Sequence, residues 1–172
     1  MFGKESEDPR VRRTRDALGD ALIALVQEKP FESITVQDLL DRAGVGRSTF
    51  YAHFSDKDDL LLSDVDDFFR HMSELPVEGR VAPVRELFAH VAEARPLYDA
   101  LQALDRAGEM LEIARGHFAR SIASHLPDFE GRAATAEALA GALFSLLAFW
   151  VRRGMREPPA EMDALFHKLV HS

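Results

Sequence analysis

The stretch from Ser33 to Leu61 constrains the fold of this chain more than any other part of the sequence. Thr35 is followed three residues later by Asp38, and a hydroxyl cap with a carboxylate in the first turn predicts the start of a short helix. Gly44 is placed to end that helix, because glycine adopts a left-handed backbone without steric cost. A second short helix is expected at once, from Gly46 to His53.

The two short helices have distinct faces. The apolar face of the first comprises Val36, Leu39, Leu40 and Ala43. In and beside the second, Val45, Phe50 and Phe54 are available for the core, whereas the opposite face carries Arg47, Ser48, Thr49, Tyr51 and His53. Two short helices joined by a glycine turn, with cationic and hydroxyl side chains on the free face of the second, predict a helix-turn-helix that fits a DNA major groove.

Helical periodicity continues along the whole chain, without the alternation typical of strands. A third helix is expected from Ser55, where Ser55 and Asp58 repeat the capping pattern, to about Met72. We expect this long helix to connect two domains and to act as a lever between them. The other expected helices cover residues 10–28, 84–94, 97–107, 110–126, 132–153 and 159 to the end. The fold class is therefore predicted to be all-α.

Charge is distributed unevenly between the two parts of the chain. The net charge of the 172 residues is −8, of which residues 1–57 contribute only −1. The acidity thus lies mainly outside the proposed DNA-binding part, as a DNA-binding domain on an acidic body requires. That part is still not basic, so DNA binding must rely on a few well-placed cations. The densest cationic cluster comprises Arg10, Arg12, Arg13 and Arg15.

Several other classes of protein lack support in the sequence. The longest apolar run, Ala138 to Val151, is too short to cross a bilayer, and the N-terminus has no signal-peptide pattern, so a cytoplasmic protein is expected. There is no cysteine, and the seven histidines have no metal-ligand spacing. No nucleophile–base pair or phosphate-binding glycine loop is present, so we expect no enzyme, metal or cofactor. The aspartates of the connecting helix are interpreted as a solvated face: Asp58, Asp59, Asp64, Asp66 and Asp67.

The string AGVGRSTFYAHFSDKDDLL resembles the N-terminal DNA-binding domain of the TetR (tetracycline-repressor-like) transcriptional regulators. The similarity extends from about Arg12 to Leu62 and keeps the glycine, the aromatic residues and the lysine in register. Gly46 and Ser48 depart from the residues commoner in the family, and both are small. The resemblance implies a three-helix helix-turn-helix domain over residues 1–57, followed by a helical regulatory and dimerisation domain over residues 58–172.

Arg47, Ser48 and Thr49 are the residues expected to read bases. Arg47 opens the second short helix, where a long cation can reach guanine O6 and N7. The resemblance places Tyr51, His53 and Lys57 on the phosphate-facing side. It also brings Thr35 and Gln37 to the DNA through the first short helix.

The resemblance further implies a homodimer formed through the last two helices, which carry more apolar surface than one small domain needs. Aromatic residues of the C-terminal part, Phe88, Phe118, Phe144 and Trp150, are candidates for lining a cavity for a small apolar effector, although aromatics at helical spacing are more often core. The expected function is a ligand-responsive repressor on a palindromic operator. Two alternatives stay open: a helical carrier of hydrophobic ligands, and a protein-interaction module with a non-functional helix-turn-helix. Salt-dependent binding to a palindromic DNA would distinguish the repressor function from both alternatives.

Overall fold

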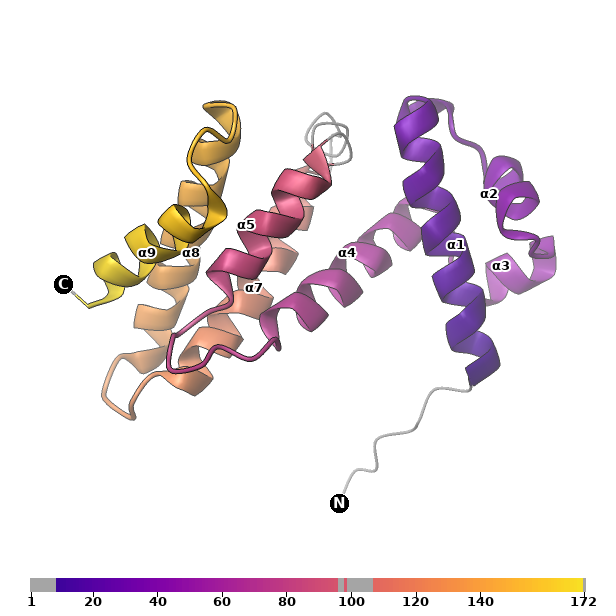
Figure 1. The fold of residues 1–172 in the computed structure, drawn as a ribbon. Coiled ribbons are helices and arrows are strands. Elements are labelled where there is room, and N and C mark those ends of the chain that lie inside the picture. Colours follow the sequence, from indigo (N-terminus) through magenta and orange to yellow (C-terminus); the bar gives the residue numbers. More distant parts are fainter. Residues whose placement is uncertain (1–8, 96–97, 99–106, 172) are drawn as a thin grey trace, which may run out of the picture. The chain divides into compact units, whose positions relative to one another are not determined.

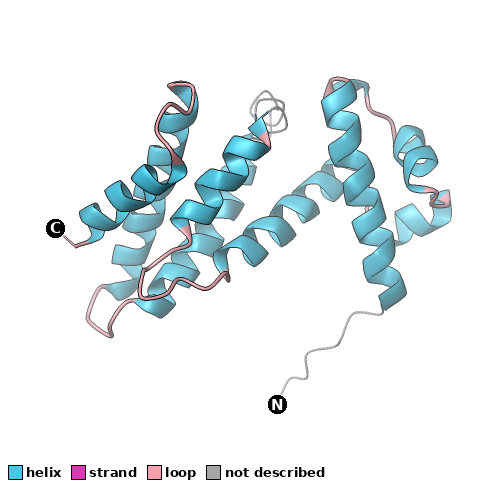
Figure 2. Ribbon diagram, viewed as in Figure 1, coloured by secondary structure: helices cyan, strands magenta, loops and turns pink. Residues whose placement is uncertain are grey.

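The computed structural model describes residues 9–95, 98 and 107–171, and within these ranges the regular structure is helical, with no strand (Figures 1 and 2). The all-α prediction is confirmed. The described residues divide into two compact units, one ending at Asp64 and the other beginning at Val65. Helix α4 (Lys57–Ser73) contributes residues to both units.

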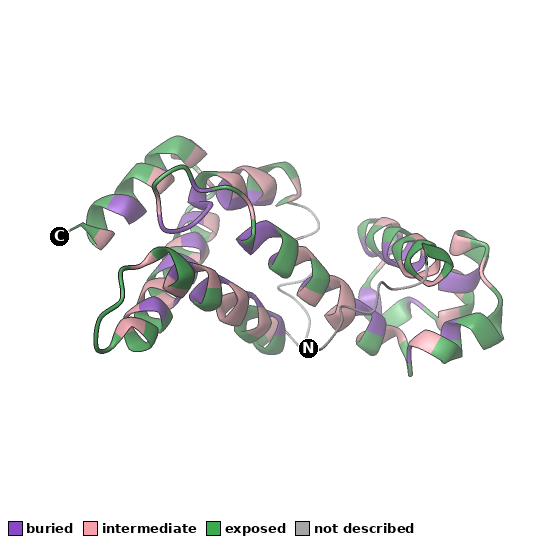
Figure 3. Cartoon of the chain, turned by 90° about the horizontal axis from the view of Figure 1, so that it is seen from below, coloured by how far each residue is buried: buried purple, intermediate pink, exposed green. Residues whose placement is uncertain are grey.

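The first unit contains α1 (Pro9–Glu28), the short 3₁₀ helix η1 (Phe31–Ser33), α2 (Val36–Ala43), α3 (Arg47–His53) and the start of α4. Figure 3 shows buried residues interspersed with exposed ones along these helices, as expected for helices with one side in a core. The most deeply buried side chains of the unit are Leu18, Leu22, Ile34, Leu39, Phe50 and Leu60. Helix α2 packs against α1 and α3 packs against α2, so the free face of α3 is presented on a packed support.

The start of α4 differs from the prediction by two residues. The backbone N–H of Asp59 donates to the Asp56 carboxylate at 2.8 Å, and the Asp59 carboxylate accepts from the Ser55 N–H at 2.9 Å. The capping side chains are thus Asp56 and Asp59, not Ser55 and Asp58, and α4 begins at Lys57. An Asp caps a helix at least as well as a Ser, so sequence chemistry alone does not decide between the two registers.

The second unit contains the rest of α4 with α5 (Val84–Glu93), α7 (Ala107–His125), α8 (Arg132–Arg152) and α9 (Pro159–Val170). Helix α7 packs along α8, and α5 packs along α9. The turn between α8 and α9 contains Gly154 at φ +83°, and the Trp150 indole N–H donates across it to the Glu157 carbonyl at 2.9 Å. The helix expected over residues 97–107 lies almost wholly outside the described residues.

Helix α8 is the one candidate for a membrane span among the described residues, by length and composition only. A core helix of a soluble protein passes the same test. Here α8 buries one face in the second unit, through Ala136, Ala140, Leu143, Phe144, Leu147 and Trp150.

Candidate nucleic-acid interface

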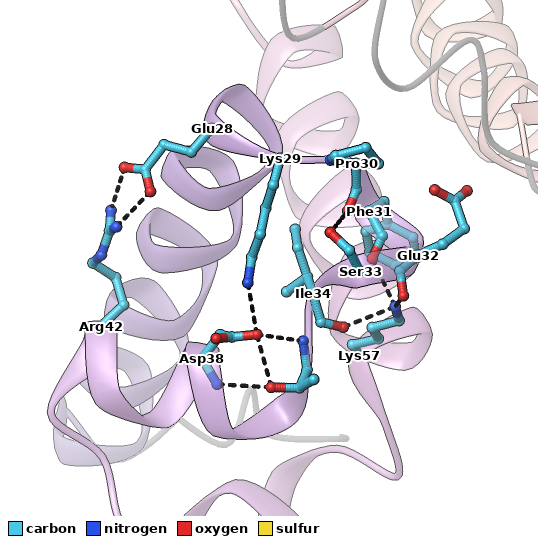
Figure 4. A network of polar contacts seen from close by, with 11 residues as sticks. Glu28, Lys29, Pro30, Phe31, Glu32, Ser33, Ile34, Asp38, Arg42 and Lys57 are labelled. Carbon is cyan, nitrogen blue, oxygen red and sulfur yellow. Dashed lines mark hydrogen bonds and ion pairs between the residues drawn. The ribbon is translucent and has the colours of Figure 1, made fainter.

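The N-terminus of α2 carries the capping box expected from the sequence. The Asp38 backbone N–H donates to the Thr35 hydroxyl at 3.1 Å, and the Thr35 backbone N–H donates to the Asp38 carboxylate at 2.7 Å. Lys29 lies 2.9 Å from the same carboxylate (Figure 4). The Lys29 ammonium, followed by the Thr35 donors, holds the pKa of Asp38 well below its ordinary value. Thr35 therefore uses its side chain to fix the helix start.

The turn between α2 and α3 is built on Gly44. Its φ of +66° and ψ of +31° place it in the left-handed region, and its N–H donates to the Leu40 carbonyl. The Val45 N–H donates to that same carbonyl at 3.2 Å. This ending of α2 lets α3 begin after a short connection, with Gly46 as its cap.

Helix α3 is anchored by one fully buried ring. Phe50 is 0% exposed and packs against Phe54 with a centroid distance of 5.8 Å. On the free face, Arg47, Ser48 and Thr49 are exposed, and Tyr51 is 51% exposed. His53 is half-buried, with its ring 6.4 Å from that of Phe54. The predicted base-reading residues of α3 are thus all exposed to solvent, and their contact with bases stays a prediction.

A series of side-chain hydrogen bonds joins α2 to the first residue of α3. Arg47 Nη2 donates to Gln37 Oε1 at 2.8 Å, and Gln37 Nε2 donates to Asp41 Oδ1 at 2.8 Å. All three residues are exposed. Gln37 and Arg47 are predicted site residues, whereas Asp41 is not among those predicted. The signal that could have found it is the four-residue spacing of Gln37 and Asp41, which places the pair on one helix face.

Lys57 occupies an internal position within this unit. Its Nζ donates to the carbonyl oxygens of Phe31 at 2.7 Å, Ile34 at 2.9 Å and Glu32 at 3.3 Å, and lies 4.4 Å from the centre of the Phe31 ring (Figure 4). An ammonium group has three N–H donors, and three carbonyls accept from this one. Lys57 therefore ties the start of α4 to η1, and its predicted phosphate contact stays a prediction.

The arginines at the N-terminal end of α1 differ in their exposure to solvent and in their contacts. Arg12 and Arg13 are exposed. Arg15 is half-buried, donates to Ser63 Oγ at 2.6 Å and lies 5.7 Å from the centre of the Phe54 ring. Arg12 and Arg13 are consequently more open to a polyanion than Arg15 is.

Asp64 is not part of a solvated face, contrary to the prediction. Its Oδ2 is buried and has no hydrogen-bond partner among the described residues, and a Cβ built on Gly19 would lie only 2.5 Å from it. Burial, reinforced by Asp20 and Asp16 and opposed by Arg15, raises the pKa of Asp64 to about 7. Helical spacing shows the face of α4 on which Asp64 lies but not that Gly19 of α1 approaches it.

The four aromatic residues proposed for a ligand cavity lie in the core of the second unit. Phe88 packs on Trp150 with a centroid distance of 4.9 Å, and Phe118 packs edge-on against Phe144 at 5.4 Å. All four side chains are buried. They contribute to packing, and a ligand-contacting role stays a prediction.

Comparison with known proteins gives a consistent picture. Residues 18–63 match the family model described as "Bacterial regulatory proteins, tetR family". The HTH-type transcriptional regulator EthR of Mycolicibacterium smegmatis is 36% identical over 122 residues, covering 58% of this chain and 56% of that protein. An uncharacterised HTH-type transcriptional regulator of Haemophilus influenzae is 41% identical over 69 residues, covering 40% of this chain and 34% of that protein. The chain thus spans about half the length of EthR and less of the other relative.

Solved structures share the fold over nearly the whole chain. A TetR transcriptional regulator from Streptococcus agalactiae superposes with a TM-score of 0.67 at 22% identity, covering 95% of this chain and 96% of that one. The dihydroxyacetone kinase operon activator DhaS superposes with a TM-score of 0.71 at 15% identity, covering 91% of this chain and 93% of that one. At these identities the similarity establishes the fold alone.

Proposed function

The chain belongs to the TetR family of bacterial transcriptional regulators, and from this we propose that it binds a palindromic DNA operator as a homodimer and regulates transcription there. The single observation that carries the proposal is the exposed face of α3. Arg47, Ser48 and Thr49 stand there on a helix whose other side is fixed by the fully buried Phe50. A short helix held rigidly in this way can present donors to base edges in a major groove.

Electrostatics of the first unit support a small number of phosphate contacts. Two of its carboxylates are already paired. The Glu28 carboxylate accepts hydrogen bonds from both terminal nitrogens of Arg42, at 3.0 and 2.7 Å, and the Asp38 carboxylate forms an ion pair with Lys29. Pairing offsets part of the repulsion that these acids would exert on a polyanion. We propose Arg12 and Arg13 as phosphate contacts, with Tyr51 and His53 of α3 in the same role.

We propose that the homodimer forms through α8 and α9. The support is apolar surface left exposed on these helices: Phe149 is 47% exposed, Leu165 44% and Leu169 57%. A two-fold dimer presents its two reading helices with inverted orientation, so its operator has inverted half-sites at a fixed spacing.

We further propose that a small apolar effector, bound near Phe88, Phe118, Phe144 and Trp150, weakens operator binding and relieves repression in the cytoplasm. A ligand shifts a two-state equilibrium only by its difference in affinity for the two states. The effector must therefore bind the DNA-free conformation more tightly, and the operator must in turn lower the affinity for the effector.

The experiment that tests DNA binding is selection of bound fragments from genomic DNA, followed by titration of the best fragment with the Arg47→Ala protein. Loss of a bidentate base contact should weaken binding by about 1–3 kcal/mol and relax one base position. Arg42→Ala is the matched control, because Arg42 is an exposed arginine of the same unit that is bound to Glu28. Equal affinity and equal base preference for Arg47→Ala and the unmodified protein would remove Arg47 from the reading set.

A further inference from the structure

We propose that Asp41 is a positioning residue for base recognition: it orients the Gln37 amide, which in turn holds the Arg47 guanidinium. This inference rests on the proposed DNA-binding function and adds a residue outside the predicted contact set. The geometry is the series of two 2.8 Å hydrogen bonds from Arg47 through Gln37 to Asp41.

The chemistry of the two end groups allows only one orientation of the amide between them. A carboxylate only accepts hydrogen bonds and a guanidinium only donates them. Gln37 must therefore direct its NH₂ toward Asp41 and its oxygen toward Arg47. In the flipped amide, N–H groups would face the guanidinium and the oxygen would face the carboxylate, and both hydrogen bonds would be lost.

Asp41 thus reinforces the orientation in which Gln37 offers Arg47 an acceptor. Without the carboxylate, the exposed amide can present either end, and Arg47 loses its fixed partner in a fraction of the molecules. A guanidinium matched to guanine O6 and N7 requires a fixed approach direction, so the base preference at that position should weaken. The spacing of Gln37 and Asp41 on α2 keeps the two side chains on one helix face, which makes the pair a stable local feature.

The charge of Asp41 makes the proposal separable from simple electrostatics. Asp41 is an exposed acid in the unit proposed to bind DNA, and the adjacent Arg42 is bound to Glu28 instead. Removing a negative charge should strengthen binding to any DNA, because the phosphates repel it. A positioning role predicts a different result, a loss of base preference: affinity for the preferred base should fall relative to affinity for the other three.

The test uses the full chain with the unmodified protein, Asp41→Ala, Asp41→Glu and Glu32→Ala. Glu32 is exposed on η1 and is not part of the hydrogen-bonded series of Arg47, Gln37 and Asp41, so its removal controls for loss of one charge. Affinity is measured by fluorescence anisotropy at one salt concentration. The DNA panel comprises the best selected operator, its single-base-pair variants at the position that Arg47→Ala relaxes, and an unrelated duplex.

Asp41→Ala should reduce the preference for the selected base pair by about fivefold to thirtyfold, a part of what one bidentate contact provides. Asp41→Glu, which keeps an acceptor in reach, should retain most of the preference, and Glu32→Ala should retain all of it. Unchanged base preference in Asp41→Ala would overturn the inference, as would a uniform change across all duplexes. Failure of the unmodified protein to bind any duplex would instead overturn the proposed function.

A double-mutant cycle identifies the route of the effect. If Asp41 acts through the amide, Asp41→Ala should have no further effect on base preference in a Gln37→Leu protein. Additive losses from the two substitutions would show that Asp41 does not act through Gln37 and would refute the proposal.

Discussion

Replacing Lys57 with methionine tests the internal role that the structure gives to this lysine. Methionine keeps most of the length and the apolar stem of the side chain but removes the ammonium. Two of the three carbonyls that lose a donor, those of Phe31 and Ile34, are partly buried, whereas that of Glu32 is exposed and can bind water.

The expected loss of stability follows from these contacts. A hydrogen bond to a charged group contributes about 1.5–3 kcal/mol, and a cation over an aromatic face at an exposed site about 0.5–1 kcal/mol. Counting the two partly buried bonds at the low end, and allowing water to reach the freed carbonyls, gives a loss of about 2–4 kcal/mol for the first unit. Lys29→Met is the matched control: it removes a solvent-screened surface ion pair with Asp38, so its loss of stability should be much the smaller of the two.

The assay is native-state hydrogen exchange of the Leu22 and Leu39 amides, which belong to buried residues of α1 and α2 and report opening of the first unit. Lys57→Met should accelerate exchange of both amides far more than Lys29→Met does. Equal effects of the two substitutions would refute the reasoning. A phosphate contact by Lys57 would instead appear as a fall of about 0.9 in the slope of log affinity against log salt, which the internal role does not predict.

Two further substitutions test other features of the first unit. In urea unfolding, Asp64→Asn should stabilise the first unit by about 2–4 kcal/mol at pH 8 and have little effect at pH 4. The reason is that the pKa of this carboxyl rises from 3.8 to about 7 on folding, so the ionised group destabilises the folded state increasingly as the pH rises from about 4 to 7. The same gain at both pH values would contradict this origin. Gly44→Ala should destabilise the unit by roughly 1 kcal/mol in the same assay, the strain of a side chain in a left-handed backbone. That strain acts alone, because the added Cβ meets no neighbouring atom; unchanged or increased stability of the Gly44→Ala protein would contradict the assignment.

The parts of the site that sequence reasoning predicted are those fixed by local chemistry. Thr35 and Asp38 are three residues apart in the chain, and their mutual hydrogen bonds need nothing from elsewhere. Gly44 ends α2 through its own backbone, and the burial of Phe50 follows from the apolar spacing of α3. Each of these features is set within a few residues.

The parts that were not predicted depend on segments far apart in the sequence. Asp64 becomes buried because Gly19, on another helix, leaves room for its carboxylate. Lys57 finds its three acceptors in residues 31–34, more than twenty positions earlier. Periodicity assigns a side chain to a face of its helix, but only the packed structure shows what lies opposite that face.

The most direct test of operator binding by a dimer of this chain is a titration of the selected operator with the full chain at several salt concentrations, with the stoichiometry determined by analytical ultracentrifugation. We expect two chains per operator, affinity that falls steeply as salt increases, and weaker binding when the spacing between the half-sites is changed by half a helical turn. Salt-independent affinity, or equal affinity for the operator and an unrelated duplex of the same length, would contradict it.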